Sequence, residues 1–246
     1  MTRPKVDPAR LARVVVAVDG PSGSGKSSVS REVARRLGLR YLDTGAMYRA
    51  VTWWMDAQGV DVHDPAAVTA LADTPDLAPG TDPTSATIAV DGTDVTGPIR
   101  SDEVTAAVSA VSAVPAVRAR LARIQRSVIA AGGIVVEGRD IGTVVAPEAE
   151  VKIYLTASEQ ARALRRTAEH SAIDQPAASD VDATRASMLR RDHLDSSRPT
   201  SPLRRAADAV EIDATDLSLD EVVETVVQLV LTRVEQTTIG KDKVSQ

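Results

Sequence analysis

The stretch from Arg13 to Ser27 decides the fold of this chain, and it runs RVVVAVDGPSGSGKS. Its first seven residues form a β-branched run that ends at Gly20, which predicts a buried strand. The rest fits G-x-x-x-x-G-K-[ST], the pattern of a phosphate-binding loop between a strand and a helix. Apolar residues at helical spacing follow and predict a helix over 26–37. Strand, loop, helix and a further strand are the opening of a parallel α/β sheet.

This loop predicts binding of ATP. Its glycines let successive backbone N–H groups point at phosphate oxygens, and the next helix adds its positive end. We expect Lys26 to reach the β- and γ-phosphates and the Ser27 hydroxyl to bind Mg²⁺. A dinucleotide fingerprint fails because Ser28 stands where its third glycine belongs, and G-x-S-x-G fails on spacing. The expected ATP-binding residues are Gly20, Pro21, Ser22, Gly23, Ser24, Gly25, Lys26, Ser27 and Ser28.

Length and composition exclude several classes of protein. A chain of 246 residues suits one large α/β domain or one domain with an insert. A net charge of -5 and 2% aromatic residues argue against nucleic acid as a partner. The absence of cysteine excludes disulfides, thiolate metal sites and cysteine nucleophiles. Apolar runs fall short of the ~18 residues that a membrane span needs, so we expect a cytoplasmic protein with no membrane partner.

Strand and helix patterns alternate on both sides of a central segment. Short apolar runs predict strands over 40–42, 133–137, 151–155 and 209–212. Apolar residues at helical spacing predict helices over 46–57, 158–169 and 181–193, and over 218–234 after a capping box of Ser218 and Glu221. We expect a core of residues 12–59 and 129–235, a loop over 171–180, and loose termini at 1–11 and 236–246.

The pattern changes between residues 60 and 128. Residues 74–85 are rich in Pro, Asp, Thr and Gly, which predicts a loop. Asp91-Gly92 lies between two β-rich runs and predicts a hairpin, and two helices are expected from Asp102 and Pro115. An antiparallel hairpin within a parallel-sheet protein indicates an inserted subdomain over 60–128.

Three polar clusters follow the predicted strands and helices. YLDTGAMYR at 41–49 supplies groups for a phosphate or, alternatively, a helix cap with a solvated arginine. EGRDIG at 137–142 places a charged pair where α/β proteins bind ligands. RRDHLDSSRP at 190–199 fits a solvated helix end or, with Arg162, Arg165 and Arg166, an arginine-bearing cover over phosphates. An N-K-x-D motif is absent, and Asp213 is a loose match to the strand-closing acid of motor ATPases.

With these clusters in this order, the sequence resembles the bacterial cytidylate (CMP) kinases from about Val14 to Val234. The most specific parts are GPSGSGKSS, YLDTGAMYRA, IRSDEV, EGRDIGTVV and RDHLDSSRPTSPL. The resemblance implies a P-loop NTPase-type parallel five-stranded sheet flanked by helices. It also implies an inserted α+β nucleotide-binding subdomain and a short helical lid at about 158–195.

The resemblance also implies a reaction, transfer of the γ-phosphoryl of ATP to CMP or dCMP, and roles for residues. Ser109, Arg118 and Asp140 would read cytosine, and Arg49 and Arg139 would hold the acceptor phosphate, with Thr44 and Tyr48 in the same pocket. Asp195 and Arg191 would lie at the ribose and Arg198 near the transferred group. Lys26, Arg139 and Arg198 are the expected catalytic residues.

The cytosine assignment agrees with residue chemistry. Cytosine presents an amino donor and two acceptors, which an acid, an arginine and a hydroxyl complement, whereas uracil would leave them mispaired. The acceptor phosphate is already largely dianionic at neutral pH, so we expect no general base. The alternatives are another small-molecule or nucleotide kinase, such as a UMP- or shikimate-type enzyme, and a non-catalytic nucleotide-dependent switch. We expect a monomer with ATP and CMP or dCMP as partners.

Overall fold

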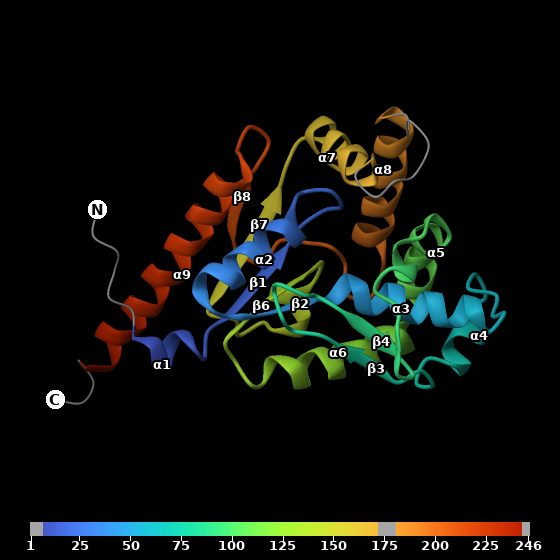
Figure 1. Cartoon of the computed structure of the whole chain (residues 1–246), viewed down its shortest axis with the longest axis horizontal. Helices are drawn as coiled ribbons and strands as arrows, with labels where there is room; N and C mark the ends of the chain where they lie inside the picture. The colour runs from blue at the N-terminus through green and yellow to red at the C-terminus, as the bar shows by residue number, and fades with distance from the viewer. Residues whose placement is uncertain (1–6, 172–180, 243–246) are drawn as a thin grey trace.

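The computed structural model of the chain describes residues 7–171 and 181–242. The loop expected over 171–180 lies outside the described residues, apart from Ser171, which ends a helix. Figure 1 shows a central sheet with helices on both sides and a second, smaller layer of chain beside it.

The central sheet contains five parallel strands in the order β2-β6-β1-β7-β8. The expected five-stranded parallel sheet flanked by helices is therefore confirmed. The central strand β1 carries the phosphate-binding loop at its carboxyl end, with β6 on one side and β7 on the other. The bounds are β1 Val15–Asp19, β2 Arg40–Asp43, β6 Ile134–Gly138, β7 Val151–Thr156 and β8 Val210–Asp213.

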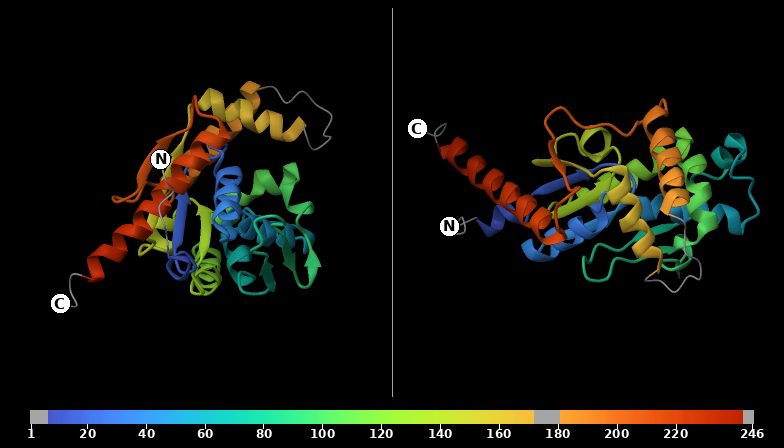
Figure 2. Two further views of the ribbon diagram at one scale, coloured as in Figure 1. Left: turned by 60° about the vertical axis from the view of Figure 1, so that its left-hand side comes forward. Right: turned by 90° about the horizontal axis from the view of Figure 1, so that it is seen from above.

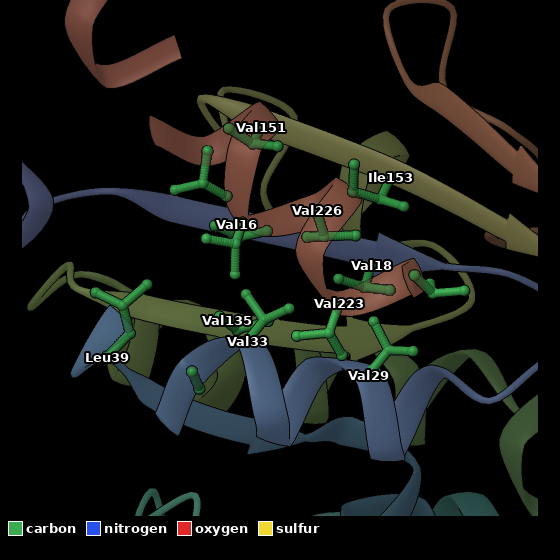
Figure 3. Close-up of a cluster of buried hydrophobic side chains, with 14 of the residues drawn as sticks. Val16, Val18, Val29, Val33, Leu39, Val135, Val151, Ile153, Val223 and Val226 are labelled. Atoms are coloured by element: carbon green, nitrogen blue, oxygen red, sulfur yellow. The ribbon is translucent and has the colours of Figure 1, made fainter. Parts of the chain in front are cut away.

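One face of this sheet is covered by α2 (Lys26–Leu37) and the C-terminal helix α9 (Leu219–Asp242). Side chains alternate along a strand, so Val16 and Val18 pack in this layer while Ala17 packs on the other face. Figure 3 shows the layer closely, where valines and isoleucines of the sheet meet valines of both helices. Each buried side chain of this size contributes about 1.5–3 kcal/mol, and together they fix α2 against the end of β1.

The opposite face is covered by α3 (Thr44–Ala57) and α6 (Pro115–Ile129). The left view of Figure 2 shows α9 and these helices on opposite sides of the sheet. Helix α3 begins earlier than the expected residue 46, because the Asp43 carboxylate accepts a hydrogen bond from the backbone N–H of Ala46 at 2.8 Å and caps the helix at Thr44.

The segment between α3 and α6 has a small sheet and helices of its own. The expected hairpin is present, with Asp91 and Gly92 at its turn, both at positive φ. The loop expected over 74–85 was wrong in part, because β3 pairs with β4 and adds a third antiparallel strand. The polar composition hid this strand, in which Leu77 is buried opposite Val90. The elements are α4 Pro65–Ala70, β3 Leu77–Pro79, β4 Ile88–Val90, β5 Thr93–Asp94, the 3₁₀ turn η1 Pro98–Arg100 and α5 Asp102–Ala113.

Helices α7 (Glu159–Ser171) and α8 (Val181–Ser197) pack against each other beyond the carboxyl end of the sheet, and α8 also contacts α5 (Figure 1). Helix α1 (Pro8–Leu11) and the extension of α9 to Asp242 lie where loose termini were expected. The expected capping box of α9 is confirmed by hydrogen bonds between Ser218 and Glu221 in both directions.

Across the described part of the chain, no single helix meets the length and hydropathy that a membrane span requires. Helices α5 and α6 reach that length and hydropathy only when they are taken together, and their axes are bent by 95° relative to each other.

Candidate active site at the carboxyl edge of the sheet

The phosphate-binding loop begins at a glycine that the sheet requires. Gly20 has φ +151°, and a Cβ atom there would lie 2.1 Å from the carbonyl oxygen of Leu155 in β7. Gly23 and Gly25 also have positive φ, at +72° and +92°. These three glycines let the chain turn from β1 into α2 within a few residues.

Lys26, the first residue of α2, is buried inside the loop. Its Nζ donates hydrogen bonds to the carbonyl oxygen of Pro21 at 2.6 Å and to Oγ of Ser24 at 3.4 Å. Burial, and next the positive charge of Arg139, lower the pKa of Lys26 to about 7. An anion bound in the loop would favour the charged form of Lys26.

Ser27 lies beside a carboxylate to which the sequence analysis gave no role. Its Oγ donates a hydrogen bond to Oε2 of Glu137 at 3.0 Å, and the Tyr41 hydroxyl donates to the other carboxylate oxygen. Burial, and next the charge of Asp43, raise the pKa of Glu137. A hydroxyl and a carboxylate side by side are the oxygen ligands that Mg²⁺ prefers, directly or through water.

The loose match at Asp213 has no part in this arrangement. Asp213 is exposed at the end of the edge strand β8, where its carboxylate accepts hydrogen bonds from Thr215. Glu137 instead closes the buried strand β6, next to β1. The signal in the sequence was present, since Glu137 is the acid that ends the apolar run GIVVE.

Arg118 and Asp140 form a buried ion pair. Nη2 of Arg118 lies 2.6 Å from Oδ2 of Asp140, and the two side chains are 4% and 7% exposed. The Arg118 guanidinium also lies over the Tyr48 ring, 5.2 Å from its centroid, and burial raises the pKa of Tyr48 to about 12. Ser109, on α5, lines one cavity together with Arg118, Asp140 and Tyr48. The fold therefore brings together an acid, an arginine and a hydroxyl that are far apart in sequence.

Asp195 of α8 accepts hydrogen bonds from two arginines. Arg139 Nε donates to its Oδ2 at 3.0 Å, and Arg198 Nη1 donates to its Oδ1 at 3.2 Å. Arg191 is largely buried nearby; burial, and next the charge of Arg139, lower its pKa to about 10. Buried Nη2 of Arg198 and Nε of Arg191 have no hydrogen-bond partner in the described part of the chain. Such unpartnered donors are suited to an incoming anion.

Arg49 lies in the second turn of α3. Its Nη2 is 3.0 Å from Oδ2 of Asp43, while Oδ1 of the same carboxylate caps the helix. The expected helix cap is confirmed at Asp43, but Arg49 is not solvated, because it pairs with Asp43 and lies in the wall of a cavity. Phosphate binding by Arg49 stays a prediction.

One cavity gathers most of the predicted site. Gly20, Pro21 and Ser24 do not line it. Its wall includes the predicted residues Ser22, Gly23, Gly25, Lys26, Ser27, Ser28, Thr44, Tyr48, Arg49, Ser109, Arg118, Arg139, Asp140, Arg191, Asp195 and Arg198. The wall also includes Asp43 of the 41–49 cluster, and residues to which the sequence gave no role, among them Ser112 and Glu137.

The turn that carries Arg139 and Asp140 is fixed by Asp19, the last residue of β1. Its carboxylate accepts hydrogen bonds from the backbone N–H groups of Ile141 at 2.9 Å and Gly142 at 2.8 Å. These residues begin a π-helical turn, η2 (Ile141–Val145). Burial raises the pKa of Asp19 to about 6 against the lowering effect of the two hydrogen bonds. Such turns are frequent at functional sites.

Helix α7 contacts the phosphate-binding loop through two of its arginines. Nη1 of Arg162 donates to the carbonyl oxygen of Ser22 at 2.8 Å and pairs with Asp192 of α8. Nη1 of Arg165 reaches the carbonyl oxygen of Ser24 at 3.5 Å. In this structure both arginines bind the loop's own carbonyl groups.

Comparisons with known proteins identify the family of this chain. The family model described as cytidylate kinase matches residues 16–232. The cytidylate kinase of Streptomyces avermitilis is 58% identical over 219 residues, which cover 88% of this chain and 92% of that protein. The cytidylate kinase of Geobacillus kaustophilus is 47% identical over 222 residues, which cover 90% of this chain and 98% of that protein. The chain therefore belongs to the cytidylate kinase family.

Proposed function

We propose that the protein transfers the γ-phosphoryl group of ATP to CMP or dCMP and so forms CDP or dCDP. One observation carries the proposal. A single cavity joins the phosphate-binding loop with Lys26 to the buried Arg118–Asp140 pair and Ser109. A donor nucleotide at the loop and a base at the buried pair would thus face each other across the arginines between them.

The donor side would hold ATP with Mg²⁺. The loop from Gly20 to Ser28 would bind the phosphates through its backbone N–H groups, and Lys26 would neutralise charge on the β- and γ-phosphates. Ser27 would hold the metal, and the adjacent Glu137 carboxylate, 3.0 Å away, fits a metal-bound water. The metal, when held there, would supply positive charge to offset the negative charge of the phosphates.

The acceptor side would read cytosine with Ser109, Arg118 and Asp140. Asp140 would accept from the amino group, while Arg118 and Ser109 would donate to the ring nitrogen and carbonyl oxygen. Uracil carries an acceptor in place of the amino group and would face the Asp140 carboxylate unfavourably. A buried polar site of this kind rejects the mispaired base strongly, because its groups are left without partners.

Arginines and hydroxyls would hold the rest of the acceptor. Arg49 and Arg139 would bind its phosphate, with Thr44 and Tyr48 in the wall of the same cavity. Asp195 and Arg191 would lie at the sugar, and Arg198 would neutralise charge on the transferred group. Nη2 of Arg198 and Nε of Arg49 are buried without a hydrogen-bond partner among residues 7–171 and 181–242, which supports these assignments.

The chemical step would need no general base. An oxygen of the acceptor phosphate attacks the γ-phosphorus, the bond from that phosphorus to the bridging oxygen breaks, and ADP leaves with the electron pair. The acceptor is already largely dianionic, since its second pKa is about 6. Lys26, Arg139 and Arg198 would align the groups and neutralise the charge that spreads over the transferred oxygens.

The chain would have three functional parts. Residues 12–59 and 129–235 would form the kinase core, 60–128 the acceptor subdomain, and about 158–195 a lid. We also propose that the protein acts as a monomer in the cytoplasm.

A coupled assay of ADP release tests the proposal. The protein is given Mg·ATP with CMP, dCMP, UMP, AMP or no acceptor. Fast turnover with CMP and dCMP alone is the expected result. Turnover with another acceptor would overturn the cytosine assignment, and ADP release that is indifferent to the acceptor would overturn the kinase assignment itself.

A further inference from the structure

Asp19 is a buried carboxylate that the proposed reaction does not use. It ends β1, directly before the phosphate-binding loop, and it is only 4% exposed. It does not line the cavity that joins this loop to the Arg118–Asp140 pair. Its two carboxylate oxygens instead accept hydrogen bonds from the backbone N–H groups of Ile141 and Gly142. The side chain therefore acts on the turn after β6 and not on a ligand.

The two hydrogen bonds cap the π-helical turn η2. The first N–H groups of a helical turn have no partner within the turn itself. The side chain of the residue just before the turn often supplies a partner, and aspartate is among the best residues for this. That residue is Asp140, but its side chain makes no capping hydrogen bond. Asp19, which lies 122 positions before Ile141, caps the turn in its place.

Asp140 differs in this respect from other aspartates of the chain. Asp7, Asp43 and Asp64 each stand just before a helix, and each carboxylate accepts a hydrogen bond from that helix's own backbone. Asp140 holds the same position before η2, yet its carboxylate pairs with Arg118 at 2.6 Å. An aspartate at this position has two competing partners, its own turn and the arginine, and the structure shows the second choice.

The charge of Asp19 favours the same choice. Burial, and to a smaller extent repulsion by Asp140, raise the pKa of Asp19 to about 6, so its carboxylate is mostly ionised at neutral pH. A negative charge at the start of η2 disfavours a second carboxylate at the same place. The occupied N–H groups and the repulsion thus both direct Asp140 towards Arg118.

We propose that Asp19 is a positioning residue for recognition of the base. By capping η2 from β1, it leaves the Asp140 carboxylate free to pair with Arg118 and to face the amino group of cytosine. Without Asp19, Asp140 would turn back to cap its own turn, and the buried Arg118 would lose its counter-charge. The inference rests on the proposed function, from which it takes the base-reading role of Asp140, and it adds a residue that contacts neither nucleotide.

Acceptor selectivity in variants of Asp19 tests the proposal. The measured quantity is kcat/KM for CMP divided by kcat/KM for UMP, each at saturating Mg·ATP. This ratio does not depend on the fraction of enzyme that is folded, so a purely structural role of Asp19 would leave it unchanged. We expect Asp19→Ala to lower the ratio at least roughly tenfold. Asp19→Asn keeps one acceptor oxygen and should lower it less.

The matched control is Glu150→Gln. The Glu150 carboxylate also accepts a hydrogen bond from a distant backbone N–H, that of Val15 at 2.8 Å, but at the opposite end of β1. Its variant should keep the selectivity of the wild type. An unchanged ratio in Asp19→Ala and Asp19→Asn, or an equal fall in Glu150→Gln, would overturn the proposal.

A second measurement needs no turnover and separates this proposal from the proposed reaction. Asp140→Ala is introduced into the wild type and into Asp19→Asn, and the loss of stability is measured by denaturant unfolding. If Asp19 keeps Asp140 on Arg118, the loss should be smaller by roughly half in the Asp19→Asn background. Equal losses would overturn the proposal. A wild type that does not phosphorylate CMP would refute the proposed reaction, while this comparison would still decide the role of Asp19.

The cap itself is checked in the wild type, without any variant. The backbone amides of Ile141 and Gly142 should be protected from hydrogen exchange, because both donate to the buried carboxylate of Asp19. Rapid exchange of both amides would overturn the proposal even if no variant of Asp19 folds.

Discussion

The carboxylate of Asp192 in α8 accepts a hydrogen bond of 2.9 Å from the backbone N–H of Ser22, within the phosphate-binding loop. Arg162 of α7 bonds both the other oxygen of Asp192 and the carbonyl oxygen of Ser22. Met188 also lies against the loop, where a Cβ on Gly23 would be 2.6 Å from its terminal methyl group. A carboxylate of the protein itself thus accepts a hydrogen bond from one backbone N–H of the loop to which we assign phosphate binding.

Asp192→Asn is expected to tighten the binding of ATP, because the competing charge on the loop is removed. A hydrogen bond to a charged group contributes about 1.5–3 kcal/mol, so an affinity gain of roughly tenfold is expected. ATP hydrolysis without an acceptor should rise as well, since α8 is held less firmly over the loop. Equilibrium titration and the acceptor-free assay measure the two effects.

The matched control for this prediction is Asp208→Asn. Asp208 pairs with Lys152 at 2.7 Å and has no contact with the loop. Weaker ATP binding by Asp192→Asn than by this control would show that Asp192 supports the loop instead of competing with its ligand.

Lys26→Met is expected to lower kcat by roughly 10²–10³, the cost of losing one group that stabilises transition-state charge. The same change should stabilise the free protein at neutral pH. The folded pKa of Lys26 is about 7 against 10.5 ordinarily, so between these values the unfolded chain binds more protons. Stability of the wild type therefore rises with pH across this window.

Thermal unfolding from pH 7 to pH 10 checks the sign of this effect. Lys26→Met should unfold at a higher temperature than the wild type at pH 7, and the difference should shrink as the pH rises. A difference that stays constant across the window would contradict the buried, weakly protonated lysine.

Asp140→Ala is expected to destabilise the protein by about 3–5 kcal/mol, because it leaves the Arg118 guanidinium buried without its counter-charge. It should also abolish the preference for CMP over UMP. The double variant Arg118→Met/Asp140→Leu restores an uncharged interior and should recover most of the stability but none of the turnover with CMP. Chemical unfolding and the acceptor assay separate the two effects, and recovery of CMP turnover in the double variant would disprove the base-reading role.

Gly20→Ala is expected to cost about 3 kcal/mol or more in unfolding free energy, because it combines a strained φ with a backbone clash. Gly97→Ala is the matched control, since Gly97 has φ -75° and open space where its Cβ would lie. Similar stability of the two variants, measured by denaturant unfolding, would contradict the close approach of the loop to β7.

Several parts of this molecule could be predicted from local sequence. The strand before Gly20 and helix α2 were predictable because their apolar residues follow the spacing of a strand and of a helix. The loop between them was predictable because glycines mark its ends. The hairpin at Asp91-Gly92 was equally local, since the turn needs two residues at positive φ. The strand Leu77–Pro79 was missed because its pairing with β4, not its composition, makes it a strand.

In the candidate site, too, local sequence predicted some features and only packing decided others. The sequence by itself determined the loop between β1 and α2 and the parallel sheet, and through the family resemblance it predicted a set of site residues. Only the tertiary structure placed Glu137 beside Ser27 and Asp192 beside Ser22. Local patterns encode elements because their periods are short, whereas these contacts join residues more than a hundred positions apart and exist only once the sheet and its helices have packed.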